Sequence, residues 1–85
     1  MIRARITGTG SYAPERVMTN ADLEKLVATS DEWIRERTGI RERRIAAEGQ
    51  ACSDLGLIAA ERALKAAGIS ADELDMIFLA TCTGD

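Results

Sequence analysis

The feature that most constrains the fold is a nearly continuous apolar segment, DMIFLATC, at residues 75–82. An alternating strand needs cover on one face only, whereas a continuous apolar run is typical of a parallel strand that is buried on both faces. Such a strand needs neighbouring strands on both sides and helices on both faces. The sequence therefore predicts an α/β protein. Because the chain stops at Asp85, directly after this strand, we also expect a fragment of a larger protein.

The rest of the chain supplies the other elements of such a fold. Residues 2–10, IRARITGTG, alternate apolar and polar side chains and predict a strand. The longest predicted helix covers residues 53–67 and ends at Gly68. Many of its apolar residues are Ala, so we expect it to pack closely against a flat surface. The two strands and this helix are expected to form a right-handed crossover unit.

Two short helices and a weak strand are predicted in between. Asn20 is a suitable N-cap for the helix ADLEKLVA. Thr29 and Glu32 have the spacing of a capping box for a second helix, DEWIRERT, which should end at Gly39. The strand IRERRIA follows, although Arg and Glu dominate it.

The composition excludes several classes of function. Without His, the chain has no His general base and no two-His metal site. Cys52 and Cys82 are too far apart for a CxxC redox pair or a zinc ligand set, and their apolar surroundings predict buried packing residues. A net charge of −3 argues against nucleic acid or an anionic membrane as partner. With no spanning segment and no signal peptide, we expect a cytoplasmic protein.

Gly8-Thr9-Gly10-Ser11-Tyr12-Ala13 matches the G-x-G-x-x-G/A pattern of dinucleotide-binding proteins. That mechanism needs a helix to begin at the motif, so that its N-terminus can hold a pyrophosphate. Pro14 and the loop after it prevent such a helix. We therefore interpret the glycines as giving backbone freedom at the end of the first strand.

The strongest candidate site consists of Thr29, Trp33 and Arg37, which follow one another at four-residue intervals and would form one stripe of a single helix. An indole can stack on a purine, and a guanidinium can bind phosphate oxygens. A nucleotide or coenzyme A offers both groups. The alternative is that Trp33, the only Trp of the chain, is part of the core.

Five arginines crowd the same region and could form an anion-binding rim. Because Glu36 and Glu42 lie between them, a salt-bridged, solvated face is the favoured interpretation. The arginines are Arg35, Arg37, Arg41, Arg43 and Arg44.

Four segments, in unbroken order, resemble the N-terminal segment of the β-ketoacyl-acyl-carrier-protein synthase III family. They are GTGSYAPERVMTN, TSDEWIRERTGIRERR, SDLGLIAAERALKAAG and LDMIFLAT, and the second is the specific one. The resemblance implies a thiolase-like fold of five layers (αβαβα), with residues 1–85 forming the N-terminal part of its first domain.

The resemblance also implies a function. The family's acyltransferases join an acyl-CoA starter, commonly acetyl-CoA, to malonyl-acyl-carrier protein with loss of CO2, which starts fatty-acid synthesis, usually as homodimers. Coenzyme A thioester is then a substrate, and no permanently bound cofactor is implied. Trp33 resembles the family's adenine-stacking tryptophan and Arg37 the arginine near the phosphates, while Thr29 and Thr38 resemble polar contacts.

The family's catalytic Cys, His and Asn would lie beyond residue 85, so the 85-residue chain alone is expected to be inactive. Cys82 is not expected to be the nucleophile, because it lies in the strand-end motif LATCTGD, where relatives carry Thr or another small residue. Gly84 stands where Pro is common. Two alternatives stay open: a starter-unit condensing enzyme of polyketide or other secondary metabolism, and a non-catalytic module that binds an adenine nucleotide or a protein.

Overall fold

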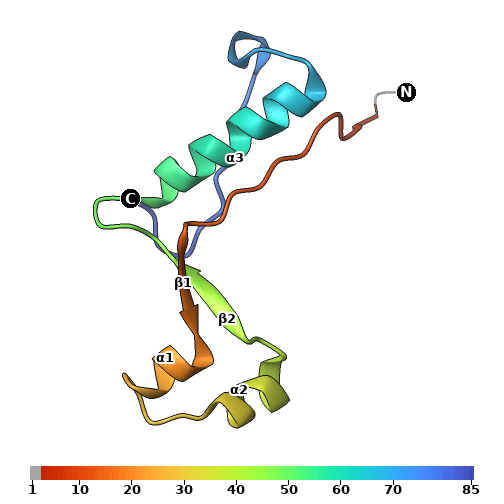
Figure 1. Ribbon diagram of the computed structural model, residues 1–85. Helices are drawn as coiled ribbons and strands as arrows, with labels where there is room; N and C mark the ends of the chain where they lie inside the picture. The colour runs from red at the N-terminus through yellow and green to blue at the C-terminus, as the bar shows by residue number, and fades with distance from the viewer. Residues whose placement is uncertain (1–2) are drawn as a thin grey trace. The chain divides into compact units, whose positions relative to one another are not determined.

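The computed structural model describes residues 3–85 and comprises two compact units (Figure 1). One unit combines the residues up to Ala13 with Gly49–Asp85, and the other is Pro14–Glu48. The elements in chain order are β1 (Arg16–Thr19), α1 (Asn20–Glu24), α2 (Asp31–Thr38), β2 (Glu42–Ile45), α3 (Cys52–Ala67) and a 3-10 helix, η1 (Ala71–Glu73).

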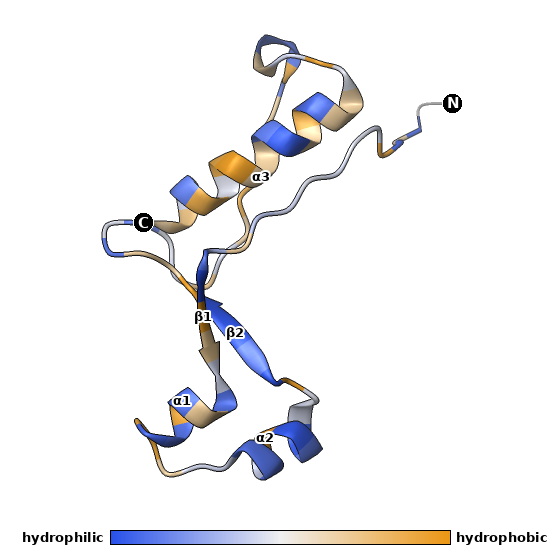
Figure 2. Cartoon of the chain, in the orientation of Figure 1, coloured by the Kyte–Doolittle hydropathy of each residue, from blue (hydrophilic) through white to orange (hydrophobic). Residues whose placement is uncertain are grey.

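In the unit Pro14–Glu48, β1 and β2 form an antiparallel pair in which Arg16 faces Ile45 and Thr19 faces Glu42. The weak strand predicted at IRERRIA is therefore confirmed. Figure 2 shows that β2 is hydrophilic along most of its length. Backbone pairing with β1 accounts for this strand, since its side chains give little apolar burial.

The helix α1 begins one residue earlier than predicted. Its N-cap is Thr19, whose Oγ1 accepts a hydrogen bond from the Asp22 N–H at 3.2 Å. The Asp22 carboxylate accepts one in return from the Thr19 N–H at 3.0 Å, and this bond lowers the pKa of Asp22. The prediction that Asn20 is the N-cap is therefore wrong, because the threonine hydroxyl before it takes that role and leaves the Asn20 side chain free for other partners.

The helix α2 has the predicted bounds, Asp31–Thr38, and ends as predicted at Gly39, which has a φ of 74°. Its N-cap is Ser30, whose Oγ accepts a hydrogen bond from the Trp33 N–H at 3.1 Å. The predicted capping box of Thr29 and Glu32 is therefore displaced by one residue. Trp33 lies at the third helical position, where its N–H needs such a partner.

In the other unit, α3 confirms the predicted long helix and its end at Gly68, which has a φ of 73°. Ala51 precedes the helix and has no side chain that could cap it. Asp85 supplies a carboxylate instead, which accepts hydrogen bonds from the Ser53 N–H at 3.0 Å and from the Ser53 hydroxyl. These bonds lower the pKa of Asp85 and hold the end of the chain against the start of α3.

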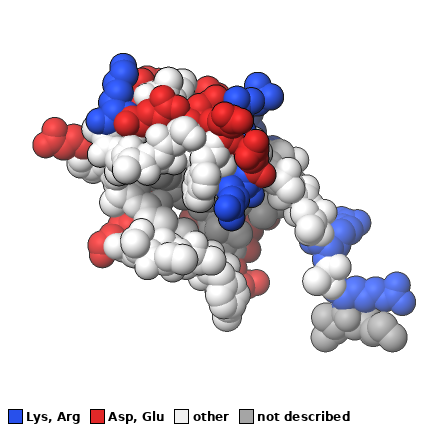
Figure 3. Space-filling model, turned by 90° about the horizontal axis from the view of Figure 1, so that it is seen from below, with Lys and Arg blue, Asp and Glu red and all other residues white. Residues whose placement is uncertain are grey.

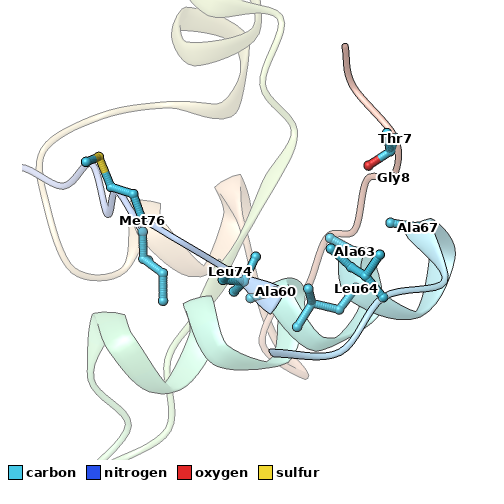
Figure 4. Close-up of a pocket in the computed structure, with 10 residues that line it drawn as sticks. Thr7, Gly8, Ala60, Ala63, Leu64, Ala67, Leu74 and Met76 are labelled. Atoms are coloured by element: carbon cyan, nitrogen blue, oxygen red, sulfur yellow. The ribbon is translucent and has the colours of Figure 1, made fainter. Parts of the chain in front are cut away.

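Gly8 and Gly10 lie against the alanine-rich face of α3. A Cβ added to Gly8 would lie 2.6 Å from the carbonyl oxygen of Ala63, and one added to Gly10 would collide with the backbone at Ala59 and Ala63. Figure 4 shows Gly8 beside this face. The predicted close packing of the helix is confirmed. The interpretation of these glycines as sources of backbone freedom is wrong, because neither has a positive φ and close approach requires them.

The strands predicted at 2–10 and 75–82 are absent from the part that the structure describes, where the sheet contains β1 and β2 alone; Ile2 lies outside that part. The expected crossover unit is consequently not formed. Both segments nevertheless flank α3, since Gly8, Ala63 and Met76 line one apolar hollow of about 310 Å³ (Figure 4). A parallel strand takes its backbone hydrogen bonds from neighbouring strands, and these segments have none within residues 3–85.

Apolar side chains of these segments are correspondingly uncovered. Phe78 is 87% exposed and Ile6 is 83% exposed. Among residues 3–85, Asn20 and Ile34 alone are buried, and both belong to the unit Pro14–Glu48. The described chain therefore has no extended hydrophobic core.

Candidate functional site

An open hollow of about 370 Å³ lies at the start of α2. It is lined by Ala28, Thr29, Ser30 and Trp33. The bond between Ser30 Oγ and the Trp33 N–H holds the rim of the hollow and the indole-bearing turn together. Trp33 is 53% exposed within residues 3–85, which favours the binding interpretation over the alternative in which this indole belongs to the core. An exposed indole beside a hollow offers a flat ring for stacking.

Arg37 lies one turn further along α2. Its guanidinium carbon is 5.2 Å from the centre of the Trp33 ring, a cation–π arrangement. The ion pair of residues 3–85 that lies on this helix joins Arg35 to Asp31, so no carboxylate of this part of the chain neutralises Arg37. The pair of Trp33 and Arg37 thus presents an aromatic face next to an unneutralised positive charge, as the four-residue spacing predicted.

Thr29 lines the same hollow, but it does not lie on the helix. Because Ser30 is the N-cap, Thr29 precedes the first turn, and its N–H donates to the Val27 carbonyl oxygen at 2.9 Å. The prediction of one helical stripe is therefore wrong for Thr29 and right for the other two residues. The hydroxyl of this half-buried residue still belongs to the rim that Trp33 completes.

Thr38 is not brought to the hollow. Its hydroxyl donates to the Ile34 carbonyl oxygen at 2.7 Å and accepts from the Ile40 N–H at 3.0 Å. Both bonds close the C-terminal end of α2. Of the four candidate residues, Thr38 therefore has a local role in the described chain.

The arginine cluster divides into two groups. Arg35 binds Asp31, Arg43 donates to Asn20 at 2.7 Å, and Arg44 donates to the Pro14 carbonyl oxygen at 2.8 Å. Arg37 and Arg41 form no ion pair within residues 3–85. Acidic and basic side chains lie beside one another on the face that Figure 3 displays, which agrees with a solvated, mixed-charge surface.

Asn20 is the most important residue of this region that the sequence did not reveal. It is 1% exposed, and its Nδ2 donates to Asp31 Oδ1 and to the Ile40 carbonyl oxygen, each at 2.8 Å. The hydrogen bond from Asn20 and the ion pair with Arg35 lower the pKa of Asp31. Ala28 and Ser30 were also missed. The sequence carried a signal for Ser30 alone, since a Ser before an acidic first turn is a common N-cap.

No group of three or more His, Cys, Asp and Glu within residues 3–85 could hold a metal ion. Cys52 and Cys82 are free thiols, the first half-buried and the second exposed. The prediction that both are buried packing residues is therefore wrong for Cys82. In the same part of the chain, none of the helices is long and apolar enough to cross a membrane.

Solved structures with a similar fold are thiolase-like condensing enzymes. The 3-oxoacyl-acyl-carrier-protein synthase III of Aquifex aeolicus matches 82% of this chain and 22% of its own at 56% identity, with a TM-score of 0.77. The priming β-ketosynthase of a polyketide biosynthetic pathway matches 84% of this chain and 21% of its own at 41% identity, with a TM-score of 0.80. The chain thus has the α/β fold of part of a thiolase-like enzyme.

The curated relatives with high identity are synthase III enzymes. The β-ketoacyl-acyl-carrier-protein synthase III of Xanthomonas oryzae is 60% identical over 84 residues, which are 99% of this chain and 26% of the relative. That of Thiobacillus denitrificans is 58% identical over 85 residues, or 100% of this chain and 27% of the relative. No family model matches. The chain spans about a quarter of these relatives, and the resemblance to the N-terminal segment of synthase III is confirmed.

Proposed function

We propose that residues 1–85 are the N-terminal part of the first thiolase-like domain of a condensing enzyme. The whole enzyme would be an acyltransferase that joins an acyl-CoA starter, acetyl-CoA in the first instance, to malonyl-acyl-carrier protein with loss of CO2. Identities of 56–60% to synthase III support this proposal. The single structural observation that supports the proposal is the half-exposed Trp33 beside a hollow. The guanidinium carbon of Arg37 lies 5.2 Å from the centre of its ring.

In this proposal the chain binds the adenine-nucleotide end of coenzyme A. The indole has two faces and Arg37 lies over one of them, so the adenine stacks on the other. The guanidinium, unneutralised within residues 3–85, binds the phosphates, and the Thr29 hydroxyl contacts the adenine end from the rim. Thr38 contributes a weaker contact, because its hydroxyl already has two partners.

These residues bind and orient a substrate and do not react with it. The acyl group passes from coenzyme A to a cysteine thiolate supplied by another part of the enzyme, and coenzyme A leaves before condensation. Cys82 is not that nucleophile. Coenzyme A thioester is a substrate rather than a resident cofactor, malonyl-acyl-carrier protein is the partner, and the enzyme acts as a cytoplasmic homodimer.

A starter-unit enzyme of polyketide metabolism is the second candidate, and the 41% identity to a priming β-ketosynthase favours it less than the 56–60% matches favour synthase III. Product analysis with the full-length protein separates the two. Acetyl-CoA and malonyl-acyl-carrier protein should give acetoacetyl-acyl-carrier protein with one CO2 and one coenzyme A per product. Use of a longer or branched acyl-CoA donor in preference to acetyl-CoA would identify the second candidate instead.

A non-catalytic binding module is the remaining alternative, and it requires the 85-residue chain to fold alone. With Asn20 and Ile34 as the buried residues of positions 3–85, we expect the isolated polypeptide to show no cooperative thermal transition. A sharp calorimetric transition, together with adenine-nucleotide binding and no condensation product, would support the module and contradict the enzyme.

A further inference from the structure

Asn20 is the most deeply buried side chain of residues 3–85, and it belongs to none of the surfaces that line the hollow. A buried amide is costly unless all of its polar atoms are hydrogen-bonded. Here Nδ2 donates to Asp31 and Ile40, and Oδ1 accepts from Arg43 at 2.7 Å. A fully satisfied amide specifies one arrangement of the groups around it.

The partners of this amide flank α2. Asp31 is the first residue of the helix, and Ile40 is the second residue after its end. The Asn20 N–H adds a bond to the Arg41 carbonyl oxygen at 3.1 Å. One residue at the junction of β1 and α1 therefore holds both ends of the segment that carries the indole and the guanidinium of the site.

Few other contacts hold α2 in place. The β1–β2 pair has its own backbone ladder and does not depend on the amide. The Asp31 N–H donates to Glu24 Oε1, and Ile34 packs its buried side chain under the helix. Loss of the Asn20 bonds would consequently loosen α2 more than the strands.

We propose that Asn20 is a positioning residue, which holds α2 so that Trp33 and Arg37 meet the adenine end of the substrate. This proposal rests on the function proposed above. Asn20 does not touch the ligand, since it is 1% exposed. Substitution of Asn20 should therefore change the KM only for substrates that carry the adenine nucleotide.

The test compares two thioesters in the full-length enzyme: acetyl-CoA, and acetyl-pantetheine, which lacks the adenine nucleotide. Asn20→Asp keeps the shape of the side chain but turns an oxygen toward Asp31 and the Ile40 carbonyl, so two hydrogen bonds become repulsive contacts. We expect the KM for acetyl-CoA to rise about tenfold or more, with kcat and the KM for acetyl-pantetheine unchanged. Leu26→Ala, an uncharged change at an exposed position outside the hollow, is the control and should alter neither KM.

Three results decide the proposal. In a Trp33→Ala background, Asn20→Asp should cause a smaller selective loss than in the wild type, because only its effect through Arg37 remains. If Trp33→Ala is selective for acetyl-CoA but Asn20→Asp weakens both thioesters equally or neither, the positioning role is wrong and the proposed function stands. If Trp33→Ala itself shows no selectivity, the proposed function is wrong.

A further variant covers the case in which Asn20→Asp does not fold. Asp31→Ala removes one of the two acceptors at a partly exposed position and leaves the bond to Ile40. It should raise the KM for acetyl-CoA selectively, by a smaller factor than Asn20→Asp. Equal losses with acetyl-CoA and acetyl-pantetheine would overturn the positioning role.

Discussion

Replacement of Trp33 by Ala removes the aromatic ring that, within residues 3–85, lines the hollow of residues 28–33. Stacking of a base on an aromatic side chain contributes ~1–3 kcal/mol. Because Arg37 occupies one face of the indole, a single face is left for adenine, and the loss should lie in the lower half of that range, about 1–2 kcal/mol. That free energy corresponds to a KM for acetyl-CoA that is roughly 5–30-fold higher.

The assay is the initial rate of thiol release, coenzyme A or pantetheine according to the substrate, by the full-length enzyme at saturating malonyl-acyl-carrier protein. Trp33→Phe keeps a ring and should recover part of the loss, whereas Leu26→Ala, at a 67% exposed position outside the hollow, should change nothing. With acetyl-pantetheine in place of acetyl-CoA, Trp33→Ala should match the wild type. An equal rise of KM for both thioesters, or no rise for either, would refute the stacking argument.

Three further predictions, all for the full-length enzyme, concern the charge of the site and the stability of the fold. Arg37→Ala should raise the KM for acetyl-CoA and flatten its dependence on ionic strength, because screening weakens only charged contacts; an unchanged salt dependence would contradict this. Gly8→Ala should lower the free energy of unfolding by ~1–3 kcal/mol in denaturant titrations, since its Cβ would lie 2.6 Å from the Ala63 oxygen, whereas Gly84→Ala, with its nearest atom at 3.9 Å, should not. The lowered pKa of Asp31 stabilises the fold above the carboxyl's ordinary pKa of 3.8, and this stability is lost as the pH falls through the folded-state value. The difference in melting temperature between wild type and Asp31→Asn should therefore shrink below about pH 4, and a constant difference would exclude the effect.

Local hydrogen bonding explains which elements could be predicted from the sequence. The ends of α2 and α3 at Gly39 and Gly68 were predicted correctly, because a left-handed glycine closes a helix whatever surrounds it. The two N-cap errors, at Thr19 and Ser30, are displacements by one residue. Each lies in a run of consecutive capping residues, where several side chains compete for the same N–H groups.

The strand predicted at 75–82 does not form within residues 3–85, for a reason that lies outside its own sequence. Its apolar pattern reports a preference for burial, but a strand forms only when neighbouring strands supply hydrogen bonds, and residues 3–85 supply none to this segment. Similarly, the pattern around Gly8 and Gly10 indicated backbone freedom at the end of a strand, which is not the reason for these glycines. Their contact with Ala63 crosses more than fifty residues of sequence, so the reason for the glycines was not visible in local spacing.

In the candidate site, too, the residues with local partners could be predicted from the sequence, and the residue with distant partners could not. Trp33 and Arg37 were found from a four-residue interval, because helical geometry brings such pairs together. Asn20 was missed, because its side chain bonds to Asp31 and Ile40, which are 11 and 20 residues away in the chain. A capping residue and a buried amide look alike until the tertiary partners are known.

Stacking of Trp33 on the adenine end of coenzyme A can be observed by 19F NMR of full-length enzyme labelled with 5-fluorotryptophan. The Trp33 resonance, assigned as the signal that Trp33→Phe removes, should shift on addition of coenzyme A or adenosine 3′,5′-bisphosphate. Pantetheine, which lacks the adenine, should leave it unmoved. A Trp33 resonance that stays in place at saturating coenzyme A would exclude stacking of the adenine on Trp33.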